Sequence, residues 1–286
     1  MEEYNRPGYV GGELFENVPS NQRSERIPGF TLQDEKAEVK EGQPYPKAGM
    51  QDRFVKVESG NKRGLILEIT EETIYLDQTG QLLRSAREIG RFIRLNKENR
   101  QLDVFTGQVN NYYPGGDQVT IYSSDNGNLL SNNDLVDWTS VDTALQTLGA
   151  QTDENGEQIM VQPRMLVTPW SQRMAALRVL GATQVRSTEG TDTETVSDNP
   201  IEGTGQATPR LVTSPRLDKL DDGDEWYLGE PDRGFIYREH WPFQSFRRRQ
   251  DTEKSFENDI VEQLKFREWG TPHCIDHRFV VKNAVS

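Results

Sequence analysis

The stretch "EITEETIYLDQTGQLLRSAREIGRFI" (68–93) begins like a strand and continues like a long helix. In its second half, apolar residues recur at intervals of four, three and four: Leu82, Ala86, Ile89 and Ile93. This spacing places the four side chains on one face of a helix. The sequence therefore predicts an amphipathic helix whose core-facing residues are these four.

The chain around this stretch carries signals for both ends of the helix. Asp77 stands where an N-cap acceptor belongs, and Gly107 stands where a C-terminal stop belongs. We therefore expect one helix from about Gln78 to Phe105. Its about 28 residues span roughly 40 Å, which is long for a helix of a globular protein.

Acidic and hydroxyl residues crowd the junction before this helix: Glu68, Thr70, Glu71, Glu72, Thr73 and Asp77. Three readings are open for them, namely a carboxylate active site, a metal cage and a polar helix entrance. Acids near a helix N-terminus are stabilised by the helix dipole, and this suffices to explain the cluster. We interpret it as a polar helix entrance.

The composition restricts the class of protein. The chain has 286 residues, 33% of them hydrophobic, and a formal net charge of −13. Such a charge argues against tight wrapping of nucleic acid, because phosphate binding needs a basic surface. The single cysteine, Cys274, excludes an intramolecular disulfide framework. No apolar run is long enough to span a membrane, and the first residues are not those of a signal peptide, so we expect a soluble protein made inside a cell.

Two segments near the start have no evident core of their own. Residues 1–28 contain prolines and glycines without a helical period, which predicts an extended arm. Phe30 to Leu67 reads as a long, charged hairpin whose tip is "KEGQPYPKAG". Because a two-stranded hairpin is marginally stable in water, we expect it to lie on a neighbouring surface.

The middle of the chain mixes helices, strands and loops. We expect a hairpin turn at Asn126–Gly127 and a short helix at 138–150 capped by Thr139 or Ser140. A buried strand then leads to a helix with Pro169 in its first turn. The segment Ser187–Pro209 is predicted to be an exposed, mobile loop. Strand patterns follow in "PRLVTSPRL", "DEWYLGE", "GFIYREHWPFQSFRRR", "ENDIVEQLKFREWG" and "DHRFVVKNAV".

The most site-like group of side chains lies near the end of the chain: His273, Cys274, Asp276 and His277. Zinc accepts all these ligand types. On a strand, however, the two histidines face one side and Cys274 the other, so the ligands do not converge. We therefore predict an ordinary strand with polar side chains and no metal site.

Other signals for chemistry are weak. Gly203–Gly205 lacks the third glycine of a dinucleotide loop, and no serine stands in a nucleophile elbow. The run Arg247–Arg249 is typical of inter-strand or intersubunit ion pairs on an acidic chain. Nothing assembles a nucleophile, a base and an oxyanion donor, so the sequence predicts neither an enzyme nor a cofactor.

Taken in order, these segments resemble one architecture. The segments that carry the resemblance are "GQPYPKAG…VESGNKRGLILEITEETIYLDQTGQLLRSAREIGRFIRLNKENRQLDVFTG", "PRMLVTPWSQRMAALRVL", "NPIEGTGQATPRLVTSPRLD…DEWYLGE" and "KSFENDIVEQLKFREWG". Together they are similar to the tailed-phage major capsid proteins of the HK-97 fold, and most similar to the Mu-type major head subunits. The resemblance covers most of residues 40–280.

The resemblance implies an α+β fold with five consecutive segments. These are an N-terminal arm (1–28), an extended hairpin loop (29–67), a peripheral domain with the long spine helix (68–112), an axial domain (113–239) and returning strands of the peripheral domain (240–286). The spine helix is the helix predicted above. Hairpin residues then form intersubunit contacts: Tyr45, Lys47, Arg53, Phe54, Val55 and Lys56.

The same resemblance implies a function and partners. The chain is expected to self-assemble through pentamers and hexamers into an icosahedral shell around double-stranded DNA, without specific DNA binding. Scaffold or protease and portal proteins are the expected assembly partners. The expected location is the virion, after assembly in the host cytoplasm. Two alternatives stay open: a nanocompartment shell of the encapsulin type, and a carboxylate metal hydrolase with a metal at Glu68 or Glu72.

Overall fold

The computed structural model describes most of the chain. The described residues are 8–32, 41, 50–76, 81–153, 156–189, 193–199, 201, 208–220, 223–249 and 257–284. Among them, no helix combines the length and the apolar character that a membrane span requires.

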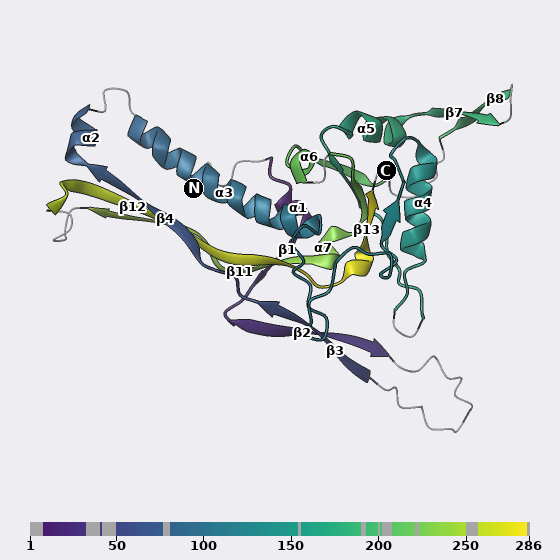
Figure 1. Cartoon of the computed structure of the whole chain (residues 1–286), viewed down its shortest axis with the longest axis horizontal. Coiled ribbons are helices and arrows are strands. Elements are labelled where there is room, and N and C mark those ends of the chain that lie inside the picture. The colour runs from purple at the N-terminus through teal and green to yellow at the C-terminus, as the bar shows by residue number, and fades with distance from the viewer. Residues whose placement is uncertain are drawn as a thin grey trace.

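A long four-stranded sheet with one long helix along it forms an extended layer pair (Figure 1). The strand order is β1-β11-β12-β4, with β1 parallel to β11 and the other neighbours antiparallel. The short helices α2 and α7 continue β4 and precede β11. The elements are β1 (Glu16–Pro19), β4 (Arg63–Thr70), α2 (Glu71–Leu76), α3 (Gln81–Phe105), α7 (Pro231–Gly234), β11 (Phe235–Arg249) and β12 (Ile260–Cys274).

The predicted long helix is present as α3. Ile93 is buried against Phe243 and Phe266 of the long sheet, and Ile89 packs against the same cluster. Gly107 follows the helix with φ +82°, a conformation that ends helices and suits glycine. Asp77 lies outside the described residues, as do the side chains of Leu82 and Ala86.

A five-stranded sheet forms the second part of the fold, in the order β5-β13-β10-β6-β9. Helices α4 and α5 pack on one face of it, where Trp226 and Leu228 point. Tyr227 points to the other face and contacts Phe105 at the end of α3, so α3 joins the two sheets. The elements are β5 (Leu129–Ser131), α4 (Trp138–Gly149), β6 (Met165–Pro169), α5 (Arg173–Gly181), β9 (Arg210–Ser214), α6 (Leu217–Leu220), β10 (Trp226–Gly229), the 3₁₀ helix η1 (His277–Phe279) and β13 (Val280–Ala284).

Several local predictions for this part were wrong in detail. Asp137 caps α4, because its carboxylate accepts the N–H of Thr139 at 2.9 Å. Pro169 ends strand β6 instead of starting α5. At the predicted turn only Gly127 has a positive φ. The predicted loop after residue 187 contains strand pairing, because β7 (Gln184–Glu189) and β8 (Thr193–Asp198) form a two-stranded ribbon.

The hairpin also differs from the predicted one. Its strands are β2 (Ser24–Leu32) and β3 (Met50–Glu58), which pair over nine residues each. The segment "RGLILEI" is instead β4 at the edge of the long sheet, paired with β12. The predicted hairpin boundaries 29–67 therefore include a strand of the long sheet. Likewise β13 belongs to the five-stranded sheet and not to the returning strands 240–286.

The described part of the N-terminal arm packs on the body of the chain, which supplies the core that the arm lacks by itself. Helix α1 (Gly11–Leu14) and β1 lie against the body of the chain. Leu14 and Phe15 are buried, and the Phe15 ring meets the Phe235 ring edge to face at 5.5 Å. These two side chains anchor the described part of the arm from residue 8 onward.

Candidate functional site

The β2–β3 hairpin projects from the body of the chain below the long sheet (Figure 1). Its two strands contact chiefly each other. The Arg26 guanidinium lies over the half-buried Phe54 ring at 4.5 Å, which is a cation–π distance. Of the predicted contact residues, Tyr45 and Lys47 lie outside the described part, and so does the side chain of Arg53.

The base of the hairpin is fixed to the body by backbone pairing. The N–H of Lys56 donates to the carbonyl of Tyr113 at 3.0 Å, and the N–H of Gly115 donates to the carbonyl of Phe54 at 2.9 Å. Val55 bridges Pro114 and packs against the main hydrophobic core. Val55 and Lys56 therefore hold the hairpin to its own subunit, and Phe54 stands at the beginning of its projecting part.

Side chains of the long sheet fix the same base from the other side. His273 Nε2 lies 2.9 Å from the carbonyl oxygen of Glu58. The Trp269 indole donates to the carbonyl of Gly60, and Arg238 forms an ion pair with Glu25. Both ions of that pair are largely shielded from water. These contacts set the direction in which the hairpin leaves the body.

His273 makes the stability of the subunit depend on pH. Burial lowers the pKa of this histidine to about 4, whereas an unfolded histidine has a pKa of about 6.5. The unfolded state therefore binds the proton first, and stability present above pH 6.5 is lost as the pH falls toward 4. Between pH 7 and 5 this loss is about 2 kcal/mol.

Urea unfolding of the unassembled subunit at both pH values measures this loss. We expect the wild-type free energy of unfolding to fall by about 2 kcal/mol more than that of His273→Gln. The glutamine keeps a donor for the Glu58 carbonyl but does not titrate. Equal losses in the two proteins would contradict the prediction.

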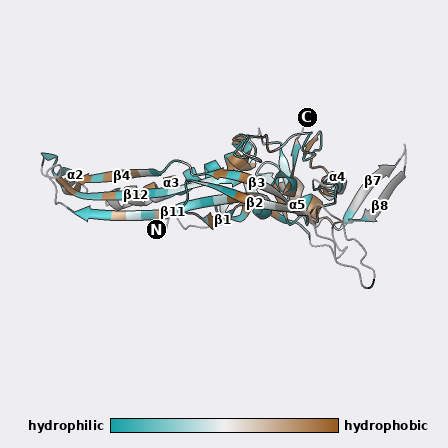
Figure 2. Cartoon of the chain, turned by 90° about the horizontal axis from the view of Figure 1, so that it is seen from below, coloured by the Kyte–Doolittle hydropathy of each residue, from teal (hydrophilic) through white to brown (hydrophobic). Residues whose placement is uncertain are grey.

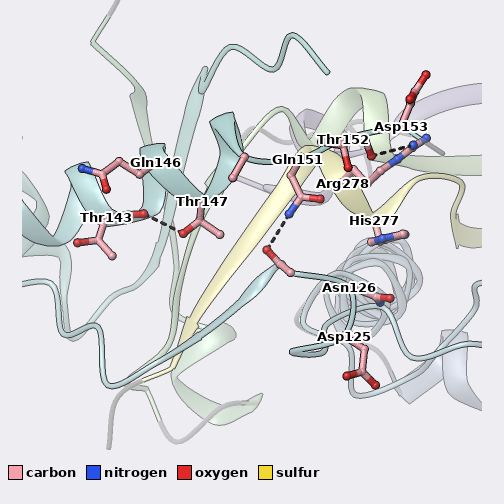
Figure 3. Close-up of a pocket in the computed structure, with 12 residues that line it drawn as sticks. Asp125, Asn126, Thr143, Gln146, Thr147, Gln151, Thr152, Asp153, His277 and Arg278 are labelled. Atoms are coloured by element: carbon pink, nitrogen blue, oxygen red, sulfur yellow. Dashed lines mark hydrogen bonds between the residues drawn. The ribbon is translucent and has the colours of Figure 1, made fainter. Parts of the chain in front are cut away.

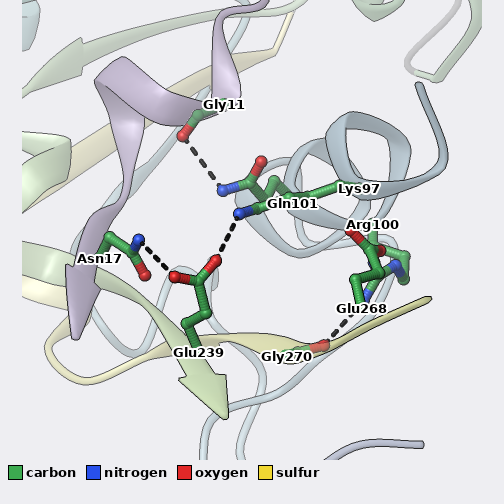
Figure 4. Close-up of polar contacts among 8 residues, drawn as sticks. All are labelled: Gly11, Asn17, Lys97, Arg100, Gln101, Glu239, Glu268 and Gly270. Atoms are coloured by element: carbon green, nitrogen blue, oxygen red, sulfur yellow. Dashed lines mark hydrogen bonds and ion pairs between the residues drawn. The ribbon is translucent and has the colours of Figure 1, made fainter. Parts of the chain in front are cut away.

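A buried polar network ties the N-terminal arm, α3 and the long sheet together (Figure 4). The Glu98 carboxylate, 4% exposed, accepts the N–H groups of Val10 and Gly11 at 2.7 and 2.8 Å. Burial raises the pKa of Glu98, and these two donors oppose that rise. Gln101 donates to the Gly11 carbonyl at 3.3 Å. One turn of α3 thus holds the start of α1.

Ion pairs between side chains hold the same face of α3 to the long sheet. Lys97 pairs with Glu239 at 3.2 Å, and Asn17 of β1 donates to the same carboxylate. Arg100 pairs with Glu268 and donates to the Gly270 carbonyl at 2.8 Å.

Sequence reasoning missed these residues, although a signal for Lys97 and Arg100 existed. Lys97 and Arg100 continue the 82-86-89-93 spacing by four and three residues, so they occupy the buried face.

The predicted acidic junction becomes the entrance to a separate short helix. β4 ends at Thr70, whose hydroxyl accepts the Thr73 N–H at 3.3 Å, and Glu71 and Glu72 form the first turn of α2. Glu68 accepts a hydrogen bond from Gln263 at 3.0 Å. Within the described ranges, no three His, Cys, Asp or Glu side chains are grouped so as to hold a metal ion.

The group His273–His277 has four separate sets of partners. His273 faces Glu58, and Cys274 is buried in the core, where burial raises the pKa of its thiol. Asp276 pairs with Arg278 at 2.6 Å, and His277 Nδ1 lies 3.1 Å from the Tyr112 hydroxyl. The strand ends at Cys274, so His277 lies in η1 and not on the predicted strand.

A polar hollow of about 740 Å³ lies between α4, the turn at 125–127 and η1 (Figure 3). Several of its polar groups have partners in their own chain. The Gln151 amide donates to the Gly127 carbonyl at 2.7 Å, and the Thr147 hydroxyl donates to Thr143 at 2.9 Å. The side chains that line it do not form a nucleophile–base pair of the kind that catalysis needs.

The overall geometry matches solved shells of tailed phages. The asymmetric unit of the bacteriophage PhiM1 mature capsid is 10% identical, with a TM-score of 0.61, covering 98% of this chain and 87% of that chain. The capsid of cyanophage P-SCSP1u is 9% identical, with a TM-score of 0.60 and coverages of 96% and 86%. The cyanophage Pam1 capsid is 12% identical, with a TM-score of 0.57 and coverages of 99% and 87%. The fold is thus the HK-97 capsid fold, as predicted.

The sequence itself matches a family model described as phage capsid protein over residues 58–283. The chain belongs to this family, and it is a major capsid protein of the virion shell. A comparison with curated proteins gives no match. The resemblance to Mu-type head subunits stays a prediction.

Proposed function

We propose that the chain assembles through pentamers and hexamers into a closed icosahedral shell around double-stranded DNA. The long sheet with α3 is the peripheral domain, and the five-stranded sheet with α4 and α5 is the axial domain. Repetition of modest contacts by symmetry stabilises such a shell. Membership of the phage capsid family supports this proposal.

The projecting hairpin is the observation that carries the proposal. A two-stranded ribbon buries little apolar surface by itself and is marginal in water. Here its attachments to the body lie at the base, around Lys56 and Glu58, while β2 and β3 continue away from it. The hairpin therefore rests on an adjacent subunit, where Phe54 contributes apolar contact.

The charge of the chain fits an inner wall that faces packaged DNA. A net charge of −13 repels phosphates, so the genome lies next to the shell without binding to it. The role is structural and not enzymatic. Scaffold or protease and portal proteins take part during assembly, as they do in the architecture that the sequence resembles.

Phe54→Asp is expected to leave the subunit folded and to reduce shell assembly at least about tenfold, because the carboxylate is desolvated only in the shell. Inside the isolated subunit the new carboxylate lies beside Arg26, which offers it a counter-ion. Circular dichroism reports the fold, and a sizing column reports the particle yield.

Phe54→Leu is the matched control, since it keeps an apolar side chain and should assemble at near wild-type yield. Wild-type particle yield for Phe54→Asp would contradict the hairpin contact. An unfolded variant would place Phe54 in the core of its own subunit. Electron microscopy of wild-type particles that contain cargo protein instead of DNA would favour the nanocompartment alternative.

A further inference from the structure

Within the described residues, the far half of the long sheet is a three-stranded ribbon with two open edges. β1 pairs with β11 only at Ile236–Glu239, so β11 has no described neighbour on its outer side beyond that point. On the opposite side, β4 pairs only with β12 within the described residues. Open strand edges are places where another chain can bind.

These two edges carry opposite charge. We define the basic edge as Phe246, Arg248 and Arg249, and the acidic edge as Ile66, Glu68, Glu71, Glu72 and Tyr75. One row of the sheet runs straight from one edge to the other, since Arg248 is opposite Gln263 and Gln263 is opposite Glu68. The ribbon is therefore polarised across its width.

Apolar residues accompany Arg248 and Glu68 on one face of the ribbon, whereas Arg249 points to the other face. A second row across the ribbon contains Phe246, Lys265 and Ile66, which lie opposite one another. This row is two residues away from the row that contains Arg248. Rows two residues apart share a face. Phe246 is 46% exposed and Ile66 is 57% exposed. Each edge thus presents an apolar side chain beside a charge.

Helix α2 extends the acidic edge. None of its residues is buried, and Tyr75 and Leu76 are 87% and 73% exposed. Glu71, Glu72, Tyr75, Leu76 and Asp259 together line a hollow of about 450 Å³. Figure 2 shows hydrophobic residues at α2 and along β4 at this end of the molecule. At its α2 end the acidic edge therefore borders a hollow lined by two apolar side chains and three carboxylates.

Within the described residues, the arginines of the basic edge and the two glutamates of α2 form no ion pairs. Arg247 pairs with Glu262 across the strands at 2.9 Å, as the sequence suggested for this run. By contrast, Arg248 and Arg249 form no ion pair with any residue that the structure describes. Glu71 and Glu72 likewise form no ion pair with any of the described residues.

We propose that the basic edge of one copy binds the acidic edge of a second copy, with Phe246 against the apolar surface of α2. The inference rests on the proposed shell and specifies one of its contacts. Within one subunit the two edges are separated by the width of β12, so they do not meet. Complementary potentials of this kind direct association and select the partner. The contact is head to tail, and such contacts close into rings when the rotation permits.

A charge exchange tests the contact. Arg248→Glu with Arg249→Glu makes both edges acidic, and Glu71→Lys with Glu72→Lys makes both edges basic. Each pair of substitutions is expected to lower the particle yield about tenfold or more, because like charges face each other. The chain with all four substitutions has the charges exchanged and is expected to recover at least about half of the wild-type yield.

Asp117→Lys with Asp125→Lys is the matched control for Glu71→Lys with Glu72→Lys, since it adds the same charge at exposed sites outside the ribbon. It should assemble like the wild type. Circular dichroism establishes that each unassembled variant is folded. Two results would overturn the contact: wild-type yield for either pair, or a fourfold variant as defective as the pairs.

The outcome separates this contact from the proposed function. If the wild type forms shells and Phe54→Asp does not, but the edge variants assemble normally, only the edge contact is wrong. If the wild-type chain forms no particles under any assembly condition, the proposed shell is wrong, and the edge contact falls with it.

Discussion

Arg100→Met is expected to lower the free energy of unfolding by about 3–5 kcal/mol, because it breaks a buried ion pair by removing one partner. Glu268 is 3% exposed, and Arg100 is its ion-pair partner. The guanidinium also donates to the Gly270 carbonyl, so one side chain holds α3 to β12 at two points. Urea unfolding of the unassembled subunit at pH 7 measures the loss.

Two controls identify the cause of this loss. Adding Glu268→Leu to Arg100→Met removes the buried carboxylate as well and should restore most of the stability. Lowering the pH should also reduce the deficit. Burial already raises the pKa of Glu268, and the loss of Arg100 raises it further, so the folded variant binds a proton more readily than the unfolded chain. A deficit that does not change from pH 7 to pH 5 would contradict this account.

Gly229→Ala is expected to cost at least about 3 kcal/mol, because the position combines a positive φ with close backbone contact. Gly229 has φ +154°, and it pairs with Val280 on one side and Met165 on the other. A Cβ there would overlap the carbonyl oxygen of Phe279 and lie 2.9 Å from the Val280 Cα. The centre of the five-stranded sheet would have to separate. Thermal unfolding measures the effect.

Gly149→Ala is the matched control for this substitution. Gly149 is the last residue of α4, and a Cβ there would meet nothing within 4 Å. The same change of residue type should leave the protein as stable or raise its stability by about 0.4–1 kcal/mol. If both variants unfold at the same temperature, backbone crowding at Gly229 does not destabilise the protein and the prediction is wrong.

Elements with a strong repeating pattern were predictable from the sequence. The helix α3 follows from the spacing of its apolar residues, and it ends at Phe105 as predicted. The long strands β11 and β12 were also predicted, because apolar and polar residues alternate over parts of both segments. In these elements the local sequence pattern and the tertiary packing favour the same structure, so the period of the apolar residues suffices to predict them.

Strand pairing was not predictable in the same way. The segment Arg63–Thr70 alternates like the second strand of a hairpin, yet its partner is β12, almost two hundred residues later. Local sequence does not specify which distant strand completes a sheet. The same limit applies to β1, whose neighbour β11 supplies the order that the arm lacks by itself.

The residues that hold the subunit together were missed for a different reason. Charged side chains on a helix are mostly solvated, so Lys97, Glu98 and Arg100 read as surface residues. Their burial depends on partners from the arm and the sheet, namely Gly11, Glu239 and Glu268. A single sequence does not show such partners, although the position of Lys97 and Arg100 on the apolar face was a usable sign.

The interleaved order of the strands has a consequence for synthesis. The long sheet takes strands from residues 16–19 and 235–274, and β13 (280–284) lies between β5 and β10 in the other sheet. The long sheet is therefore incomplete on the ribosome until residue 274 has emerged, and the five-stranded sheet is incomplete until β13 has emerged. Folding with such distant contacts is slow and begins late. A nascent subunit therefore does not present finished assembly surfaces, and polysomes full of unfinished chains do not nucleate shells prematurely.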